Sequence, residues 1–256
     1  MYAQEIQQLM HTKTKLTAVI ILLFSTLLYS ICTAQGSGGG ASSVSENNIQ
    51  ISHKCEKDAT RLSISYLSQQ GFIDIIAVPN KTKNSLHKAL MAIRNSKNHH
   101  AKKVSKLDIH THPKPFYIGH LNVNCTIDAD WLIPIEKGDP MTSNETINEL
   151  ITTYNLNISN YNKENKSFTI SAYPYINMDA LAKRLSTIEG VVVSIPKVHH
   201  SEHNITVENI GKDTWMITYI KQYFDKNEIP YKKQWSFSVD AAGNVIFLDE
   251  VMISDR

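Results

Sequence analysis

Histidine is the residue type in this chain whose number and spacing most suggest metal chemistry. The sequence holds 11 histidines among 256 residues. His110 and His112 are two apart, which would place both side chains on one side of a strand, and imidazole is a common ligand of zinc and copper. A second group of histidines follows near residue 200. If the two groups lie close together in the fold, Glu202 or Asp108 could complete a Zn or Cu site. The histidine ligands would be His110, His112, His199, His200 and His203. Irregular chain around Pro113, without any metal, is the alternative interpretation.

Two of the three cysteines lie on apolar stripes that could face a core. Cys55 is one of several apolar residues at helical spacing, and Cys125 is one of several apolar residues at every second position of a predicted strand. In an oxidising compartment this even pair could close a Cys55–Cys125 disulfide, and two buried free thiols are the alternative.

The motifs of hydrolytic enzymes are missing from the sequence. It contains no Gly-x-Ser-x-Gly nucleophile elbow and no His-Glu-x-x-His or Cys-x-x-Cys spacing. The nearby carboxylates Asp128, Asp130 and Glu136 do not by their spacing make a glycosidase pair. The sequence therefore favours a protein that is not an enzyme.

The N-terminus carries a targeting pattern. Lys13 and Lys15 precede an apolar run over 16–31, and Cys32-Thr33-Ala34 supplies small residues for cleavage. We expect a signal peptide over 1–34, with translation starting at Met1 or Met10, and an uncleaved anchor is the alternative. Cleavage would export the chain to the periplasm, the cell surface or the medium, with no membrane span remaining.

The overall charge argues against nucleic acid as a partner. It is +2 for the whole chain, and a globally basic field that would attract phosphates is absent. Residues 81–106 nevertheless hold eight Lys or Arg and no acid. This stretch is either a solvated helix face or a docking patch for an anionic envelope component or a protein.

The expected order of elements is α+β. A Gly/Ser-rich leader over 35–50 precedes an N-terminal helix-rich α+β region over 51–130. That region should contain a helix over 52–70 with Ser52 as N-cap, a strand or link over 72–78, a helix over 83–96 and extended chain over 106–127.

A central module over 131–198 has the order β-α-β-β-α-β, the ferredoxin-like plan. Its first strand is expected at the apolar run over 132–135, and Thr142 with Glu145 forms a capping box for the first helix. A hairpin surrounds residues 162–166, Asn177 caps the second helix, and 191–195 is expected to be a strand with neighbours on both sides. The remaining chain, 199–256, alternates as an antiparallel meander.

Two runs of the central module carry a resemblance to a known family. INELITTYNLNISNYNKENKSFTISA, followed by NMDALAKRLSTIEGVVVSIPKVHH, resembles the subtilisin propeptide and related peptidase-inhibitor domains. This resemblance implies that the residues after the last strand enter a protease cleft: Ser194, Ile195, Pro196, Lys197, Val198, His199 and His200.

The chain is also similar to uncharacterised proteins secreted by Gram-negative bacteria, in which a Cys-Glu-Lys-Asp-Ala helix start, here 55–59, precedes such a module. That similarity implies export and a shared architecture. The hypothesis from the sequence is an exported, non-catalytic binding protein with an unknown partner. A peptidase inhibitor or propeptide-like chaperone, and a His-rich metal-binding protein, are the alternatives.

Overall fold

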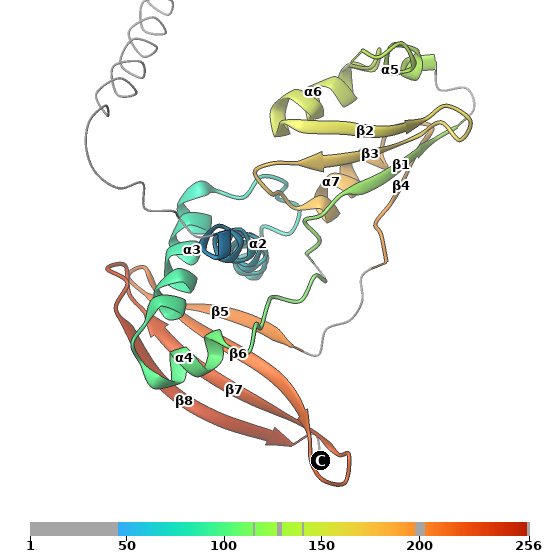
Figure 1. The fold of residues 1–256 in the computed structure, drawn as a ribbon. Coiled ribbons are helices and arrows are strands. Elements are labelled where there is room, and N and C mark those ends of the chain that lie inside the picture. Colours follow the sequence, from blue (N-terminus) through green and yellow to red (C-terminus); the bar gives the residue numbers. More distant parts are fainter. Residues whose placement is uncertain (1–45, 115, 127–129, 140, 198–202, 255–256) are drawn as a thin grey trace, which may run out of the picture. The chain divides into compact units, whose positions relative to one another are not determined.

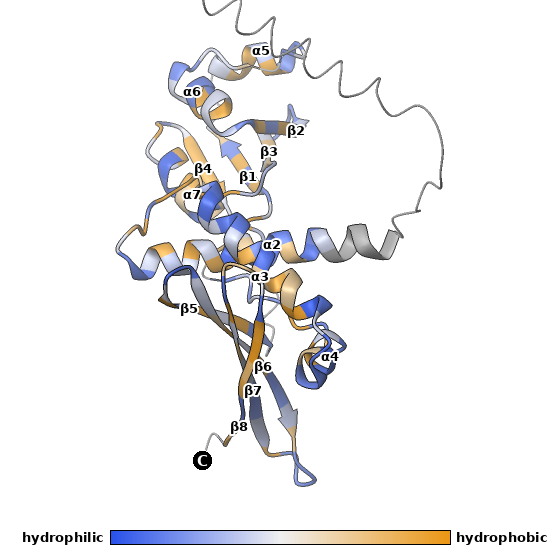
Figure 2. Ribbon diagram, turned by 90° about the vertical axis from the view of Figure 1, so that its left-hand side faces the viewer, coloured by the Kyte–Doolittle hydropathy of each residue, from blue (hydrophilic) through white to orange (hydrophobic). Residues whose placement is uncertain are grey.

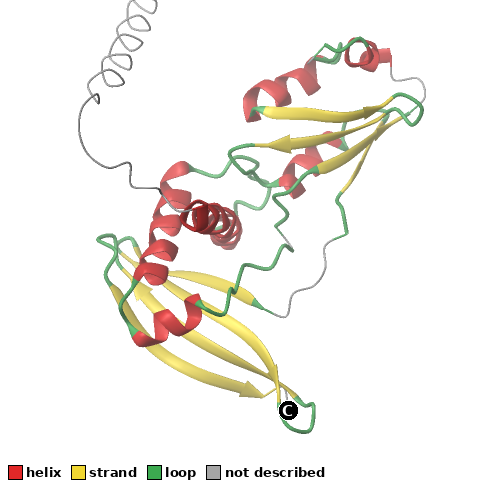
Figure 3. Ribbon diagram, viewed as in Figure 1, coloured by secondary structure: helices red, strands yellow, loops and turns green. Residues whose placement is uncertain are grey.

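The computed structural model describes residues 46–114, 116–126, 130–139, 141–197 and 203–254. They form an α+β structure with two antiparallel sheets of four strands each, shown in Figures 1 and 3. The predicted signal peptide over 1–34 lies outside these residues, as does the predicted leader up to residue 45. No described helix combines the length and the apolar content needed to cross a bilayer.

Three helices open the described chain: α2 (Glu46–Gln69), α3 (Asn80–Asn95) and α4 (His99–Ser105). Apolar and polar stretches alternate along α2 and α3, as Figure 2 shows, so each helix has one face that can enter a core. Ser52 is not the N-cap of α2, because the helix begins six positions earlier and no glycine or proline interrupts the intervening chain. No strand forms over 72–78.

A helix that the sequence analysis did not predict, α4, follows α3 and precedes the segment over 106–127 that was expected to be extended. Asn98 starts α4 by accepting hydrogen bonds from the backbone N–H groups of His100 and Ala101. Within the described part of 106–127, the strand is limited to β1 (Leu121–Cys125). A seven-residue helix contains too few turns to show a clear apolar period, so the sequence pattern did not reveal it.

The C-terminal meander is confirmed as a sheet of four strands in the order β5-β6-β7-β8. These are β5 (Asn204–Gly211), β6 (Thr214–Phe224), β7 (Pro230–Val239) and β8 (Val245–Ser254). Alternate side chains of β6 and β7 enter a core with apolar residues of α2, α3 and α4, so the three helices cover one face of this sheet. The most buried residues of this core include Ile217, Trp235 and Phe237.

The other sheet consists of β1, β2 (Leu156–Asn162), β3 (Ser167–Ala172) and β4 (Val191–Ser194). Its order is β2-β3-β1-β4, and every neighbouring pair is antiparallel. Helices α6 (Glu145–Tyr154) and α7 (Met178–Leu185) contribute to the core on this sheet. The expected hairpin over 158–172 is confirmed. The predicted role of Asn177 as N-cap of α7 is also confirmed, because its side chain accepts a hydrogen bond from the backbone N–H of Ala180.

The first strand predicted for the central module is wrong. The apolar run over 132–135 lies in a short 3-10 helix (Asp130–Leu132) and in α5 (Ile133–Glu136), while the strand that pairs with β3 and β4 is β1. Pro134 sits in the first turn of α5, where its fixed φ favours a helix. Leu132 and Ile135 are three apart and both buried, which suits a helical turn.

Two further details differ from the expectation. Asn144, rather than Thr142, is the N-cap of α6 and accepts a hydrogen bond from the backbone N–H of Ile147. Strand β4 is an edge strand instead of an inner one, and Val192 is 59% exposed. A run of β-branched residues is compatible with an inner or an edge strand, because packing against neighbouring elements, rather than strand propensity, decides the position of a strand in the sheet.

The aromatic core of the C-terminal sheet should dominate its stability. Phe237 is fully buried and packs edge-on against Tyr219 and Phe247, with centroid distances of 6.1 and 5.6 Å. Phe237→Ala should lower the free energy of unfolding by about 3–5 kcal/mol in urea denaturation, because a cavity remains. Ile246→Ala, at a position that is 61% exposed, should change it by less than about 1 kcal/mol. Equal losses for the two variants would contradict this assignment of the core.

Candidate functional site

The buried carboxylate of Asp58 organises the most connected polar cluster among the described residues. Asp58 lies in α2 and is 2% exposed. Its Oδ1 accepts hydrogen bonds from the backbone N–H and the hydroxyl of Thr111, at 2.9 and 2.7 Å. Its Oδ2 lies 2.7 Å from His110 Nδ1. One charged group therefore holds two successive residues of the chain between α4 and β1.

A second carboxylate lies on the other side of the His110 ring. Asp108 Oδ1 is 3.1 Å from His110 Nε2, and Lys54 Nζ lies 2.9 Å from Asp108 Oδ2. The hydrogen bond to Asp58, together with the charges of both carboxylates, raises the pKa of His110. The hydrogen bond from Lys54 lowers the pKa of Asp108. The cluster thus favours a protonated imidazole between two carboxylates.

This arrangement resembles part of a catalytic triad, but no hydroxyl or thiol of a described residue forms a hydrogen bond with the His110 ring. A carboxylate orients the histidine, yet the Thr111 hydroxyl donates to Asp58 instead of facing the ring. Among the described residues, the His110 ring forms hydrogen bonds with Asp58 and Asp108 alone. The geometry supports a clamp that fixes the segment around residue 110, rather than acyl transfer.

Two of the histidines that were expected to share a metal, His110 and His112, have different hydrogen-bond partners. His110 is bound by two carboxylates, whereas His112 Nδ1 lies 2.9 Å from the carbonyl oxygen of Lys114. Both occupy irregular chain instead of a strand, so they do not share a strand face. His203 is described, but His199, His200 and Glu202 lie outside the described residues. Within the described ranges no group of three His, Cys, Asp or Glu side chains could hold a metal ion.

The predicted Cys55–Cys125 disulfide is wrong. Both thiols are free, and they belong to different hydrophobic clusters. Burial raises the pKa of each thiol, that of Cys125 to about 11. Such thiols are protonated at neutral pH and are poor nucleophiles. Alternation and helical spacing showed correctly that both face apolar surroundings, but spacing could not show which cores they enter.

The residues expected to act as an inhibitory tail are described only in part. Ser194 ends β4, Ile195 packs against the core of its own sheet, and Pro196 and Lys197 follow in irregular chain. Val198, His199 and His200 lie outside the described residues. The proposed contact of this tail with a protease therefore stays a prediction.

The basic stretch over 81–106 is partly neutralised by the protein itself. Lys83 is buried, with its Nζ 3.8 Å from Glu56 Oε1, and Lys103 Nζ lies 3.1 Å from Glu250 Oε1. Lys88 Nζ donates a hydrogen bond to the carbonyl oxygen of Ala241. These contacts fit a structural role for several of the cations, and docking to an anionic surface stays a prediction.

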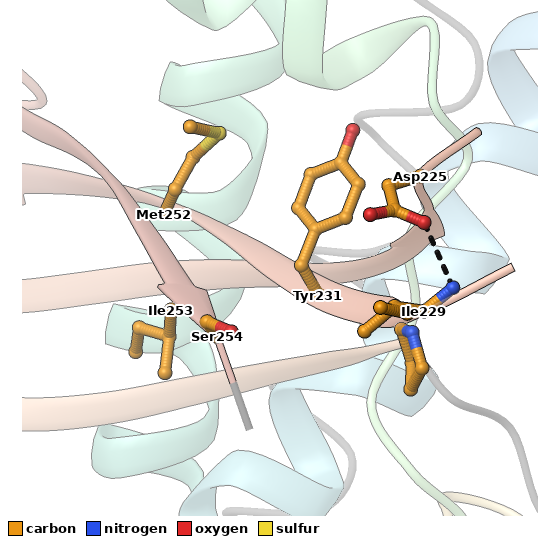
Figure 4. Close-up of a pocket in the computed structure, with 7 residues that line it drawn as sticks. Asp225, Ile229, Tyr231, Met252, Ile253 and Ser254 are labelled. Carbon is orange, nitrogen blue, oxygen red and sulfur yellow. Dashed lines mark hydrogen bonds between the residues drawn. The ribbon is translucent and has the colours of Figure 1, made fainter. Parts of the chain in front are cut away.

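An apolar pocket that the sequence did not single out lies at the end of the C-terminal sheet. Figure 4 shows its lining side chains, which come from the β6–β7 turn, the start of β7 and the end of β8. The volume is about 640 Å³, and the lining residues are Asp225, Ile229, Pro230, Tyr231, Met252, Ile253 and Ser254. Asp225 Oδ1 accepts hydrogen bonds from the backbone N–H groups of Asn227 and Ile229, which fixes the turn.

Exposure marks this pocket as a candidate binding surface. Met252 is 65% exposed, and Ile229 and Ile253 also remain accessible. Contiguous exposed apolar side chains are typical of interaction sites. Alternation in the sequence predicts that these positions belong to a strand. Only the order of the described strands shows that β8 lies at the edge of the sheet.

Comparison with known protein families, curated proteins and solved structures found no match for this chain. The resemblances to subtilisin propeptides and to secreted Gram-negative proteins stay predictions.

The clamp at His110 should make stability depend on pH. Because the folded-state pKa of His110 is raised, its contribution is complete below the unfolded pKa, about 6.5, and is lost as pH rises through the folded pKa. His110→Gln should therefore cost about 1.5–3 kcal/mol near pH 5.5 and less near pH 9. Urea denaturation across this range measures both values.

The control for this prediction is His120→Gln, because His120 is exposed and its hydrogen bond to Tyr117 comes from the backbone N–H instead of the ring. That variant should keep the pH profile of the wild type. A cost of His110→Gln that is the same at both pH values, or larger at the alkaline end, would contradict the clamp.

Proposed function

We propose that this chain is an exported, non-catalytic binding protein whose partner is a polypeptide. The partner adds an extended segment along β8 and places an apolar side chain in the pocket beside Met252. The observation that carries the proposal is a long edge strand, exposed on its open side, that ends at an apolar pocket. Addition of a strand to a sheet edge is a common mode of peptide recognition.

The four sheet edges differ in how well they could receive a strand. In the sheet of β1–β4, edge strand β4 has four residues, and edge strand β2 is irregular between Ser159 and Asn162. In the C-terminal sheet, β5 has eight residues and an irregular end after Asn209. Short or bulged edges resist pairing with other chains, so these three are poor templates.

Strand β8 lacks most of these protections. It has ten residues, contains neither lysine nor proline, and is irregular only near Leu248, opposite the step from Ser236 to Phe237. The following residues, 249–254, pair regularly with β7 and lead directly into the pocket. Its two charges are Asp249 and Glu250, and Glu250 is already bound by Lys103. Backbone pairing would supply affinity, and the pocket would supply selectivity.

For the central module we propose a ferredoxin-like fold. The β-α-β-β-α-β order over 121–194 and the antiparallel sheet order β2-β3-β1-β4 support it. This plan occurs with many functions and does not by itself assign one.

Selection of peptides tests the proposed function. A phage-displayed library of random dodecapeptides, panned on the purified protein, should yield sequences in which apolar residues alternate with polar ones. Met252→Glu should weaken the selected peptides by about tenfold or more, because a carboxylate would have to enter an apolar pocket. Binding should also shift the backbone amide resonances of residues 249–254.

Ile246→Glu is the matched control, since Ile246 is an equally exposed apolar residue at the other end of β8. It should leave peptide binding unchanged. Equal effects of the two variants, or no enriched peptide, would contradict the proposal. Sedimentation equilibrium tests the competing possibility of self-association. If the wild type is a dimer and Met252→Glu is a monomer, β8 pairs with a second copy of this chain, and the proposal of a peptide partner is wrong.

The second candidate function is peptidase inhibition through residues 194–200. Strand β4 is an edge strand with Val192 exposed, so this side of the module is open to a partner. The protein at micromolar concentration should then slow subtilisin-like proteases, and Pro196→Gly with Lys197→Gly should reduce the effect. Full activity across a panel of such proteases would exclude this function.

A further inference from the structure

A small polar cavity lies between α2, the segment around residue 112 and the start of β5, away from the β8 pocket. Its volume is about 110 Å³. At roughly 30 Å³ for each water molecule, it has room for about four waters or a ligand of similar size. Because it involves neither β8 nor residues 194–200, an inference about it is independent of the proposed function.

Arg61 is the main charged group of this cavity. Its guanidinium donates a long hydrogen bond, 3.4 Å, to the Thr111 hydroxyl, and its Nε is buried with no hydrogen-bond partner among the described residues. Burial lowers the pKa of Arg61, and the nearby Asp58 opposes this shift. Both oxygens of Asp58 are occupied by Thr111 and His110, however, and Arg61 forms no ion pair with a described residue. Arg61 is half-buried, and a cation partly removed from water without a bound counter-ion is costly.

The other polar groups at the cavity also favour an anion. Among the lining residues that the structure describes there is no aspartate or glutamate, whereas Lys114 and Asn204 contribute donors. Asn204 Oδ1 accepts hydrogen bonds from the backbone N–H groups of His112 and Ile205. The side-chain amide therefore has its NH₂ donors left for a ligand.

The rest of the lining is apolar and selects among anions. Leu62, Phe116, Ile205 and Val207 contribute to the wall. Phosphate and sulfate have oxygens on all sides and would leave some of them against these side chains without a partner. A carboxylate on a short alkyl chain fits better, because its two oxygens match the planar fork of a guanidinium and its carbon atoms contact the apolar wall.

We infer that this cavity binds a small organic carboxylate through Arg61 and Asn204. Propionate, with five non-hydrogen atoms, is the probe of suitable size. For so small a ligand the dissociation constant should be on the order of 1 mM. The carboxylate could be a free acid or the C-terminus of a peptide, and N-acetylalanine mimics the latter.

Titration of the purified protein, followed by NMR amide shifts, tests the inference. Propionate should shift amides of residues 111–112 and 204–207, and its neutral isostere propionamide should not. Arg61→Gln should weaken binding by tenfold or more, and Arg61→Lys should also weaken it because the bidentate fork is lost. Arg184→Gln, at an exposed position of α7, is the matched control and should bind as the wild type does.

Asn204→Asp provides a second variant in case Arg61→Gln does not fold. It keeps the acceptor for His112 and Ile205 but replaces the NH₂ donor by a carboxylate oxygen, so it should abolish propionate binding by repulsion. Tighter binding of propionate than of N-acetylalanine assigns a free acid, and the reverse assigns a peptide C-terminus. No shift with either carboxylate, equal binding by propionamide or phosphate, or wild-type binding by both Arg61→Gln and Asn204→Asp would overturn the inference.

Discussion

The buried carboxylate of Asp58 is the interaction on which the first half of the structure depends. It lies on α2 and binds His110 and Thr111, which belong to the chain that runs from α4 toward β1. A buried charge is tolerated when all its oxygens are hydrogen-bonded, and here they are. The same bonds leave Arg61, one turn further along α2, without a carboxylate of its own. The carboxylate of Asp58 thus both fixes His110 and Thr111 and leaves the guanidinium of Arg61 available to a ligand in the cavity.

A second constraint is the inequality of the sheet edges. Every open sheet has two edge strands with unpaired backbone groups, and natural sheets protect them by shortness, bulges, proline or lysine. Strands β2, β4 and β5 are short or irregular, and β8 is neither along residues 249–254. The aromatic core on the helix-covered face includes side chains of β6 and β7, and residues 249–254 of β8 pair with β7. This pairing orders the backbone of β8 before a partner binds, which lowers the entropic cost of adding an extended segment.

The contrast between the two cysteines shows how local patterns and distant packing differ. Cys55 lies among apolar residues at helical spacing, and Cys125 lies on the apolar face of an alternating strand. Spacing alone therefore predicted that both face apolar surroundings, and the structure buries Cys55 and half-buries Cys125. Their pairing could not be predicted from spacing, because it depends on which core each element enters. Likewise, the apolar run at 132–135 fits a short helix or a strand, and β1 took the place in the sheet that this run was expected to occupy.

The sequence by itself determined the α+β class, the hairpin over 158–172, the Asn177 cap and the antiparallel meander at the C-terminus, while the structure shows that this meander has four strands. These features follow from short-range periods and turn residues, which act within a few positions of the chain. Only the tertiary structure decided that β4 and β8 are edges, that His110 meets Asp58 rather than His112, and that Arg61 faces a cavity. These contacts join residues about 50 to 140 positions apart, and no local pattern encodes the partner of a side chain at that distance.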